Sequence, residues 1–148
     1  MKNTNPALIN PKNIARRYDD IGYRKEVRKY MNSEYMNFGY WEKDTRDAGE
    51  ACDNLMKRLL AFIPTRQRKG RILDVACGKG ATTQYLLKHY RPQAVTGINV
   101  SAKQLGTARK IAKGCTFKVM DATALQFPDN SFDNLICVEA AFHFNTRE

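Results

Sequence analysis

Long apolar runs are absent from this 148-residue sequence, and their absence sets the first limits on what the protein does. No segment comes close to the run of about 18 apolar residues that a membrane-spanning helix requires. The opening residues, "MKNTNPALINPKN", lack the apolar centre of a secretory signal peptide. Apolar residues still make up 43% of the chain, which is enough for a packed core. We therefore expect a soluble, cytoplasmic protein with no membrane partner.

Metal ligands and disulfide partners are also scarce. The sequence has two histidines and four cysteines, and the cysteines form no C-x-x-C pair. They are Cys52, Cys77, Cys115 and Cys137. Zinc sites need clustered ligands, and stable disulfides need an oxidising compartment. The pattern predicts no metal site and free thiols in a reducing compartment.

Acidic residues are outnumbered, because 25 Lys and Arg against 15 Asp and Glu give a net charge of +10. The excess is spread along the chain, with 15 basic and 9 acidic residues in 1–70 and 10 and 6 in 71–148. The dense basic run at 15–30 repeats its cations at i, i+4, as a solvated helix face does. This distribution favours exposed surface over a nucleic-acid site, and it is compatible with an anionic small molecule.

Residues 1–65 have the pattern of a polar, helical cap. Within them, "DAGEACDNLMKRLLAFIP" (47–64) repeats apolar residues at helical spacing and closes at Pro64, which predicts an amphipathic helix. Before it, "MNFGYWEKD" (36–44) is aromatic without periodicity, and we expect a loop there.

From residue 66 the pattern changes, and we treat 66–148 as the second part of one incomplete domain. Apolar, β-branched runs predict strands at 71–76, 94–100, 115–121 and 132–138. Helices are expected at 81–90 and 101–114, the second opened by a capping box of Ser101 and Gln104. Strands that alternate with helices predict a parallel α/β sheet, with its ligand at the carboxyl ends of the strands.

The glycine-rich segment "ILDVACGKGATT" (72–83) follows the first of these strands, where a nucleotide-binding loop is expected. It does not fit a Walker A loop, because Leu73 stands in place of the first glycine and Gly80 in place of the Ser or Thr. It fits a dinucleotide fingerprint poorly, because Thr83 replaces the third glycine. Instead, "LDVACGKG" resembles motif I of the class I S-adenosylmethionine-dependent methyltransferases.

This resemblance covers residues 70–148 and implies a Rossmann-like sheet with helices on both faces, preceded by the helical cap. It also implies S-adenosylmethionine as the methyl donor. Asp74 suits the cationic amino acid end of this donor, while Gly78 and Gly80 let the backbone approach it. Ala76 stands where the family has its first glycine.

The ends of the second and third strands extend the resemblance. Asn99, in "VTGINVS", stands where the family usually has Asp or Glu for the ribose hydroxyls, and its amide is a weaker acceptor than a carboxylate. Asp121 and Ala122, in "MDATAL", resemble the adenine site, and Gln104 lies near the ribose in similar proteins. The donor-binding residues that the resemblance implies are Tyr18, Trp41, Asp74, Ala76, Cys77, Gly78, Gly80, Asn99, Val100, Gln104, Asp121 and Ala122.

The segment after the fourth strand, "LICVEAAFHFNTRE", bears on the methyl acceptor. It lacks the Asn/Asp-Pro-Pro-aromatic turn typical of methyltransferases that act on nucleic-acid bases. It resembles the E-x-x-x-H pattern (Glu139 to His143) of small-molecule members, which implies His143 as a catalytic base. The segments "YDDIGY" and "FGYWE" resemble covers of the donor pocket, with Tyr18 at the donor carboxylate and Tyr40 and Trp41 in the wall. Core packing is the alternative role for each of these rings.

We predict an S-adenosylmethionine-dependent methyltransferase that acts on a small molecule, with oxygen as the first choice of acceptor atom. An RNA-directed methyltransferase and a non-catalytic, donor-binding subunit are the alternatives. The family's sheet has more strands than the four predicted here, so we expect a fragment that stops after the fourth strand. That strand would then be an open apolar edge, which favours self-association.

Overall fold

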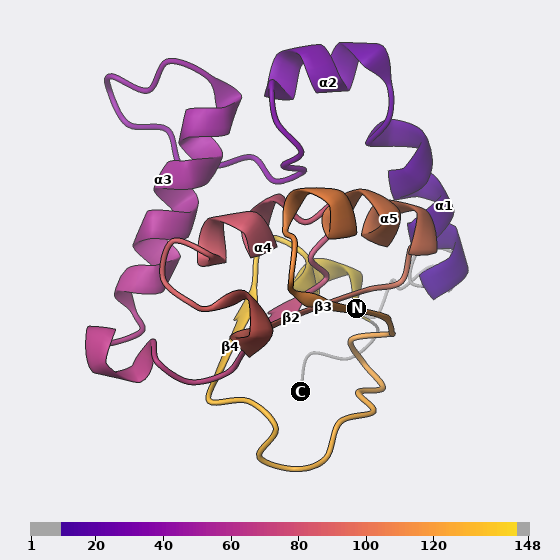
Figure 1. The fold of residues 1–148 in the computed structure, drawn as a ribbon. Coiled ribbons are helices and arrows are strands. Elements are labelled where there is room, and N and C mark those ends of the chain that lie inside the picture. Colours follow the sequence, from indigo (N-terminus) through magenta and orange to yellow (C-terminus); the bar gives the residue numbers. More distant parts are fainter. Residues whose placement is uncertain (1–9, 145–148) are drawn as a thin grey trace, which may run out of the picture.

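The computed structural model describes residues 10–144, and Figure 1 traces them by colour. Its helices are α1 (Pro11–Ile21), α2 (Lys25–Met31), α3 (Ala48–Ala61), α4 (Ala81–Leu86) and α5 (Ala102–Ile111). Its strands are β1 (Ile72–Val75), β2 (Val95–Asn99), β3 (Thr116–Val119) and β4 (Asn134–Cys137). Short 3₁₀ turns are η1 (Thr65–Gln67), η2 (Pro92–Ala94) and η3 (Ala141–His143).

The strands form one parallel sheet in the order β3-β2-β1-β4. β1 lies inside the sheet, and all of its residues are buried. Val75 at its end pairs with Ile98 of β2 and with Cys137 of β4, so the carboxyl ends of the strands reach one common edge. The predicted parallel α/β sheet is confirmed, and this edge positions the site.

Helices α3, α4 and α5 cover one face of the sheet. Ile72 and Ile136 pack there against Leu60 of α3 and Leu86 of α4, and Figure 1 shows α4 and α5 crossing in front of the strands. On the other face, the cluster around Leu73 is completed by side chains from loops, among them Phe127, Phe132 and Phe144. Within residues 10–144, loop side chains therefore pack the second face, where the resemblance implied helices.

The amphipathic helix predicted at 47–64 is confirmed as α3, although it is shorter. It begins at an N-cap, where Asp47 Oδ1 accepts a hydrogen bond from the amide of Glu50 at 2.9 Å. It ends at Ala61 because the next amide, that of Phe62, bonds three residues back to Leu59 and tightens the last turn.

The segment 36–44 is a loop, as predicted, and it lies against α3. Gly39 has a φ of +72°, and a Cβ there would come within 2.5 Å of the carbonyl carbon of Ala51. The amide of Tyr40 donates to the carbonyl of Ala51 at 2.7 Å. A side chain at residue 39 would push the loop away from the helix, so glycine is needed for this contact.

The helices between the strands differ from prediction in detail. α4 ends at Leu86 instead of residue 90, because the following amides tighten into bonds to carbonyls three residues back. α5 begins as predicted, with Ser101 Oγ accepting from the amide of Gln104 at 3.0 Å. The reciprocal half of the capping box is wrong, because the Gln104 side chain accepts from Asn99 instead. No helix within residues 10–144 has the length and apolarity to cross a membrane.

Candidate functional site

A cavity of about 630 Å³ opens at the carboxyl edge of the sheet and is walled by α1 and the loop before α3. It lies where the α/β topology predicts a ligand, because the segments after all four strands border it. The predicted residues that line it are Tyr18, Trp41, Asp74, Ala76, Cys77, Gly78, Asn99, Val100, Gln104, Asp121, Ala122 and His143. The fold therefore brings all the predicted donor-binding and catalytic residues except Gly80 to one cavity.

The loop after β1 carries three residues in the left-handed region. Ala76 has a φ of +58°, Gly78 of +55° and Gly80 of +91°. A Cβ on Gly78 would meet only Gln104 Oε1, at the ordinary contact distance of 3.7 Å, so the cavity side of this residue is open. Gly80 does not line the cavity, and a Cβ there would approach Ala108 Cβ of α5 to 2.6 Å. The missing side chain of Gly80 lets the start of α4 pack on α5, and a contact of Gly80 with the donor stays a prediction.

Asp74 is buried at the back of the cavity, with 1% of its surface exposed. The hydroxyls of Thr82 and Thr83 both donate to its Oδ2, at 2.6 and 2.7 Å. Burial raises the pKa of the carboxyl to about 6, although the two hydroxyls act in the opposite direction. A cation arriving in the cavity would favour the ionised carboxylate and lower this pKa.

Asn99 and Gln104 form a bonded pair at the end of β2. Asn99 Nδ2 donates to Gln104 Oε1 at 2.9 Å, and Asn99 Oδ1 accepts from the amide of Val100 at 3.0 Å. Gln104 Nε2 is buried and has no hydrogen-bond partner among residues 10–144. A buried donor without a partner is unfavourable unless a ligand satisfies it, so this atom is available to a ligand acceptor.

Asp121 follows β3 and forms a turn as well as lining the cavity. Its Oδ1 accepts from both the amide and the hydroxyl of Thr123, each at 2.9 Å. This is the ordinary turn-forming role of an aspartate. The turn orients the carboxylate beside Ala122 at the cavity edge.

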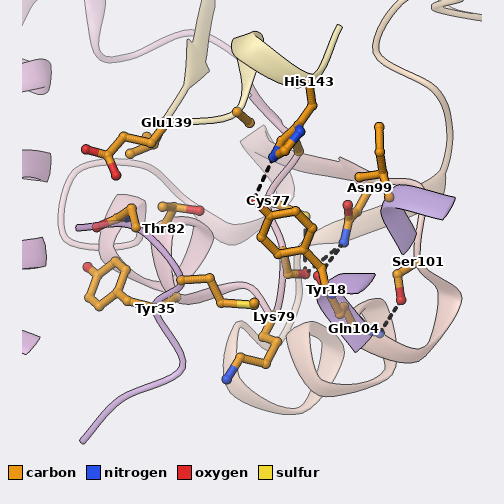
Figure 2. A pocket seen from close by; sticks show the side chains of 18 of the residues that line it. Tyr18, Tyr35, Cys77, Lys79, Thr82, Asn99, Ser101, Gln104, Glu139 and His143 are labelled. Atoms are coloured by element: carbon orange, nitrogen blue, oxygen red, sulfur yellow. Dashed lines mark hydrogen bonds between the residues drawn. The ribbon is translucent and has the colours of Figure 1, made fainter. Parts of the chain in front are cut away.

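His143, at the end of η3, is paired with Tyr18 of α1. Tyr18 Oη and His143 Nε2 are 2.6 Å apart, and the rings meet edge to face. Burial, assisted by the charge of Arg17, lowers the pKa of the imidazole, so His143 is neutral at pH 7. Figure 2 shows this pair between the Asn99–Gln104 side of the cavity and the Thr82–Glu139 side. Tyr18, expected at the donor carboxylate, thus has its hydroxyl on the candidate base.

Asn37 is a site residue that sequence reasoning missed. It lines the cavity, is 8% exposed, and its Oδ1 has no partner among the described residues. Its neighbour Phe38 donates its amide to Glu139 Oε2 at 2.7 Å, which places this part of the loop beside the end of β4. The only signal was a polar residue inside an aromatic, aperiodic segment.

Of the two aromatic residues predicted in the cavity wall, Trp41 lines the cavity and Tyr40 does not. Trp41 lines the cavity, and its Nε1 donates to the carbonyl of Phe38 at 3.0 Å. Tyr40 is not part of the lining, and its ring instead packs under the guanidinium of Arg58, 4.0 Å away. The expectation for Tyr40 is therefore corrected. The structure shows no group of three or more potential metal ligands between residues 10 and 144.

Comparison with known proteins identifies the family. The model of the methyltransferase domain family matches residues 72–148. The chain is 29% identical to 27-O-demethylrifamycin SV methyltransferase of Amycolatopsis mediterranei, over 93% of this chain and 51% of that protein. It is 30% identical to O-methyltransferase cnsE of Penicillium expansum, again over 93% and 51%. The chain therefore spans about half the length of these curated relatives.

Solved structures agree on the fold. The [4+2]-cyclase SpnF superposes with a TM-score of 0.64 at 27% identity, over 85% of this chain and 48% of that one. Coclaurine N-methyltransferase, solved with N-methylheliamine and SAH, gives a TM-score of 0.60 at 22% identity, over 95% and 44%. The family match over more than half of the chain, together with these relatives, shows that the chain belongs to the class I S-adenosylmethionine-dependent methyltransferases.

Proposed function

We propose that this chain binds S-adenosylmethionine and takes part in transferring its methyl group to an oxygen atom of a small molecule. The observation that supports this most is a single cavity bordered by the motif I loop and by His143. Relatives named as oxygen methyltransferases, such as cnsE and a fatty-acid O-methyltransferase of Mycolicibacterium smegmatis, favour oxygen. A cytoplasmic location and self-association along the β4 edge, where Leu135 is exposed, stay predictions.

The polar groups of the cavity that have no partner within the described part of the chain fit this donor. Gln104 Nε2 is a buried hydrogen-bond donor that suits a ribose hydroxyl, beside the amide of Asn99. Asn37 Oδ1 is a buried acceptor near the end of β4, and together with Asp74 it suits the ammonium group. The open backbone at Gly78 admits a ligand between these two ends.

When bound, S-adenosylmethionine supplies an electrophilic methyl group on a positively charged sulfur. Neutral His143 would be the final base, which gains a proton as the acceptor hydroxyl loses one and its oxygen takes the methyl group. Because Tyr18 Oη already occupies Nε2, the acceptor proton would pass to Oη while the phenol proton moves to Nε2. The two side chains would then act as one relay.

A second candidate function comes from the likeness to SpnF, which is described as a [4+2]-cyclase. The cavity has apolar walls, including Trp41, Phe142 and Phe144, which could fold an apolar substrate without consuming the donor. Formation of S-adenosylhomocysteine during turnover separates methyl transfer from cyclisation.

The two sequence-based alternatives are tested with the same protein. An RNA-directed enzyme would bind RNA with an affinity that falls steeply as salt rises. A non-catalytic subunit would bind the donor and produce no S-adenosylhomocysteine with any hydroxyl-bearing acceptor.

The test of the proposal is calorimetric titration of the chain with S-adenosylmethionine and S-adenosylhomocysteine, with NAD as the competing ligand. We expect saturable binding of the first two, which Asp74→Ala and Asp121→Ala abolish or weaken. Asp129→Ala, in the turn at 128–131 and outside the cavity lining, is the matched control. Binding of NAD in place of the methyl donor would overturn the proposal.

A further inference from the structure

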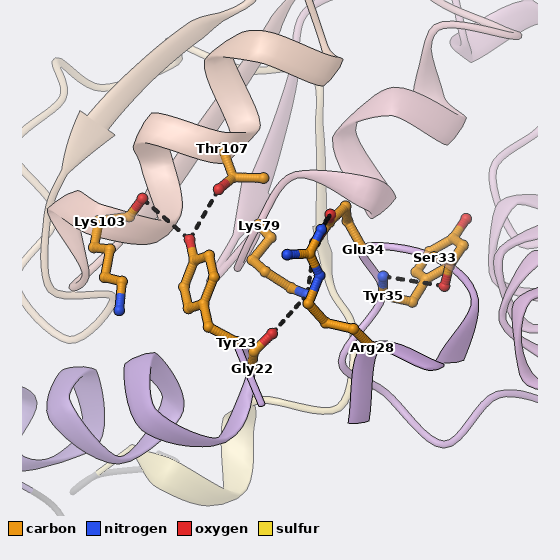
Figure 3. Close-up of polar contacts among 9 residues, drawn as sticks. All are labelled: Gly22, Tyr23, Arg28, Ser33, Glu34, Tyr35, Lys79, Lys103 and Thr107. Atoms are coloured by element: carbon orange, nitrogen blue, oxygen red, sulfur yellow. Dashed lines mark hydrogen bonds and ion pairs between the residues drawn. The ribbon is translucent and has the colours of Figure 1, made fainter. Parts of the chain in front are cut away.

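Lys79 stands between the two glycines of motif I, yet its ammonium is buried and bonded to the cap. Its side chain is 1% exposed, and Nζ lies 2.7 Å from Glu34 Oε2. Nζ also donates to the carbonyl of Gly22 at 3.0 Å and lies 5.7 Å from the centre of the Tyr23 ring. Figure 3 shows the long side chain reaching from its loop to these groups.

Burying an ammonium is unfavourable unless every part of the charge is compensated. Here the compensating groups come from the cap: Gly22 and Tyr23 lie between α1 and α2, and Glu34 follows α2. Glu34 is held in turn by Arg28 of α2, at 3.5 Å. The charge is therefore stable in this position only while the cap is closed on the glycine loop.

The same cap segment is attached to α5 by a neutral contact. Tyr23 Oη lies 2.9 Å from Thr107 Oγ1 and donates to the carbonyl of Lys103 at 3.3 Å. Tyr23 thus places the connection between α1 and α2 on the core, whereas Lys79 joins it to the loop that borders the cavity. A shift of α1 would move Tyr18 away from His143. The Lys79 contact therefore affects the position of Tyr18 as well as that of the glycine loop.

We infer that Lys79 is a positioning residue, which closes the N-terminal cap over the donor by its buried ion pair with Glu34. This rests on the proposed function, since the ligand concerned is S-adenosylmethionine. Because its ammonium is bonded to Glu34 and Gly22 of the cap, we assign Lys79 no contact with the reacting atoms. It raises the population of the closed, binding-competent cap and holds the glycine loop in a fixed position relative to α1.

The experiment compares Lys79→Met, which keeps the length of the stem, with Lys79→Arg and Glu34→Gln. Affinity for S-adenosylhomocysteine is measured by calorimetry, and amide hydrogen exchange is followed in the ligand-free protein. Lys88→Met is the matched control, because Lys88 makes an exposed ion pair with Asp53 outside the cavity. We expect Lys79→Met to raise the Kd about tenfold, as the closed fraction falls. Glu34→Gln should do so less, Lys79→Arg should retain part of the affinity, and Lys88→Met should change nothing.

Hydrogen exchange separates positioning from simple loss of stability. Residues 11–31 should exchange faster in Lys79→Met, while the strands of the sheet keep their protection. Unchanged affinity together with unchanged exchange in the cap would overturn the inference, and so would equal loss of protection in the cap and the sheet. If the unmodified chain binds no donor, the proposed function fails, and exchange in the cap alone decides whether Lys79 holds it closed.

Discussion

The core from β1 to β4 and the cap from α1 to α3 contribute to the same cavity in different ways. In the core, ligand-facing residues follow strand ends, so the local backbone sets the positions of Gly78 and Asn99. In the cap, Tyr18 and Asn37 reach the cavity only because helices and loops dock on the core. The core therefore provides donor-binding positions by topology, and the cap completes the site by tertiary contacts.

Tyr18 of the cap and His143 of the core form the hydrogen-bonded pair that joins the two regions, and replacing them gives the largest expected effect. His143→Ala should lower kcat for methyl transfer by about 10²–10⁴-fold, because it removes the proton acceptor. Tyr18→Phe should lower kcat in the same direction, and the double variant should be no worse than His143→Ala, since residues of one relay are not additive. Formation of S-adenosylhomocysteine with a hydroxyl-bearing acceptor is the measurement. Donor affinity near that of the unmodified chain is the control, and additive losses would contradict the relay.

Removing the neighbouring charge tests the environment of that base. Arg17 helps to lower the pKa of His143, so Arg17→Gln should raise this pKa. A base works in its neutral form, and the acid limb of the pH–rate profile should therefore move to higher pH. A profile that does not move, or one that moves to lower pH, would contradict His143 as the titrating base.

In the core, Asp74 makes donor binding depend on pH. Its pKa is raised to about 6 by burial, and a cationic donor favours the ionised form, so binding releases a proton below that pH. The donor Kd should rise as pH falls through about 6, by at most about tenfold per pH unit for one proton. Calorimetry between pH 5 and 8 measures this. Asp74→Asn should bind weakly with no such pH dependence, and an unchanged slope in this variant would assign the proton to another group.

The same raised pKa has an opposite consequence for the ligand-free fold. The folded state binds the Asp74 proton more tightly than the unfolded chain, so stability should fall as pH rises from about 4 to about 6. The loss is about 3 kcal/mol at most. Chemical denaturation across this range measures it, with Asp74→Asn as the reference that lacks the term. The residue that suits the donor is thus one that the empty fold tolerates poorly.

Core and cap each place one buried polar atom without a partner among residues 10–144 at the cavity: Gln104 Nε2 in the core and Asn37 Oδ1 in the cap. Gln104→Leu removes the donor Nε2 and the acceptor for Asn99, whose Nδ2 keeps a 3.4 Å bond to the carbonyl of Gly78. Asn37→Ala removes Oδ1, which has no partner among residues 10–144. Each should weaken binding of S-adenosylhomocysteine about 2–10-fold, the contribution of one neutral hydrogen bond. Stability should hardly fall for Asn37→Ala, because its Oδ1 makes no hydrogen bond within residues 10–144. A large loss of stability with unchanged affinity would assign Asn37 a packing role.

The core could be predicted further than the cap for a physical reason. The parallel sheet and the cavity-lining positions after its strands are local consequences of apolar runs, turn glycines and strand ends. Tyr18 and Trp41 were placed at the cavity by resemblance alone, but the bond from Tyr18 to His143 spans 125 positions and no periodicity reports it. Asn37 was missed for the same reason. The sequence gives Lys79 no role once the Walker A loop is excluded, because its partner Glu34 lies 45 positions away and only the fold brings the two together.

Packing between elements gives residues of the core contacts that their motifs do not report. Gly80 is expected at the ligand because motif I contains it, and the structure also needs its missing side chain for the packing of α4 on Ala108. Gln104 was assigned to a capping box by its spacing from Ser101, but its side chain accepts from Asn99. In both cases the local motif is present, and a neighbouring element decides which of its possible contacts forms.

The smallest expected effect lies at Ala76, where the core departs from the family's glycine. A non-glycine residue at φ +58° is strained, because its Cβ approaches the following carbonyl oxygen. Ala76→Gly should relieve this, offset in part by the greater freedom of glycine in the unfolded chain, for a gain of about 0.5–1 kcal/mol. Thermal unfolding should show a rise in Tm of about 1–4 °C. Ala94→Gly, in η2 and outside the cavity, should lower the Tm. Because Ala76 borders the cavity, unchanged donor affinity in Ala76→Gly would show that the alanine affects the stability of the core and leaves its ligand site intact.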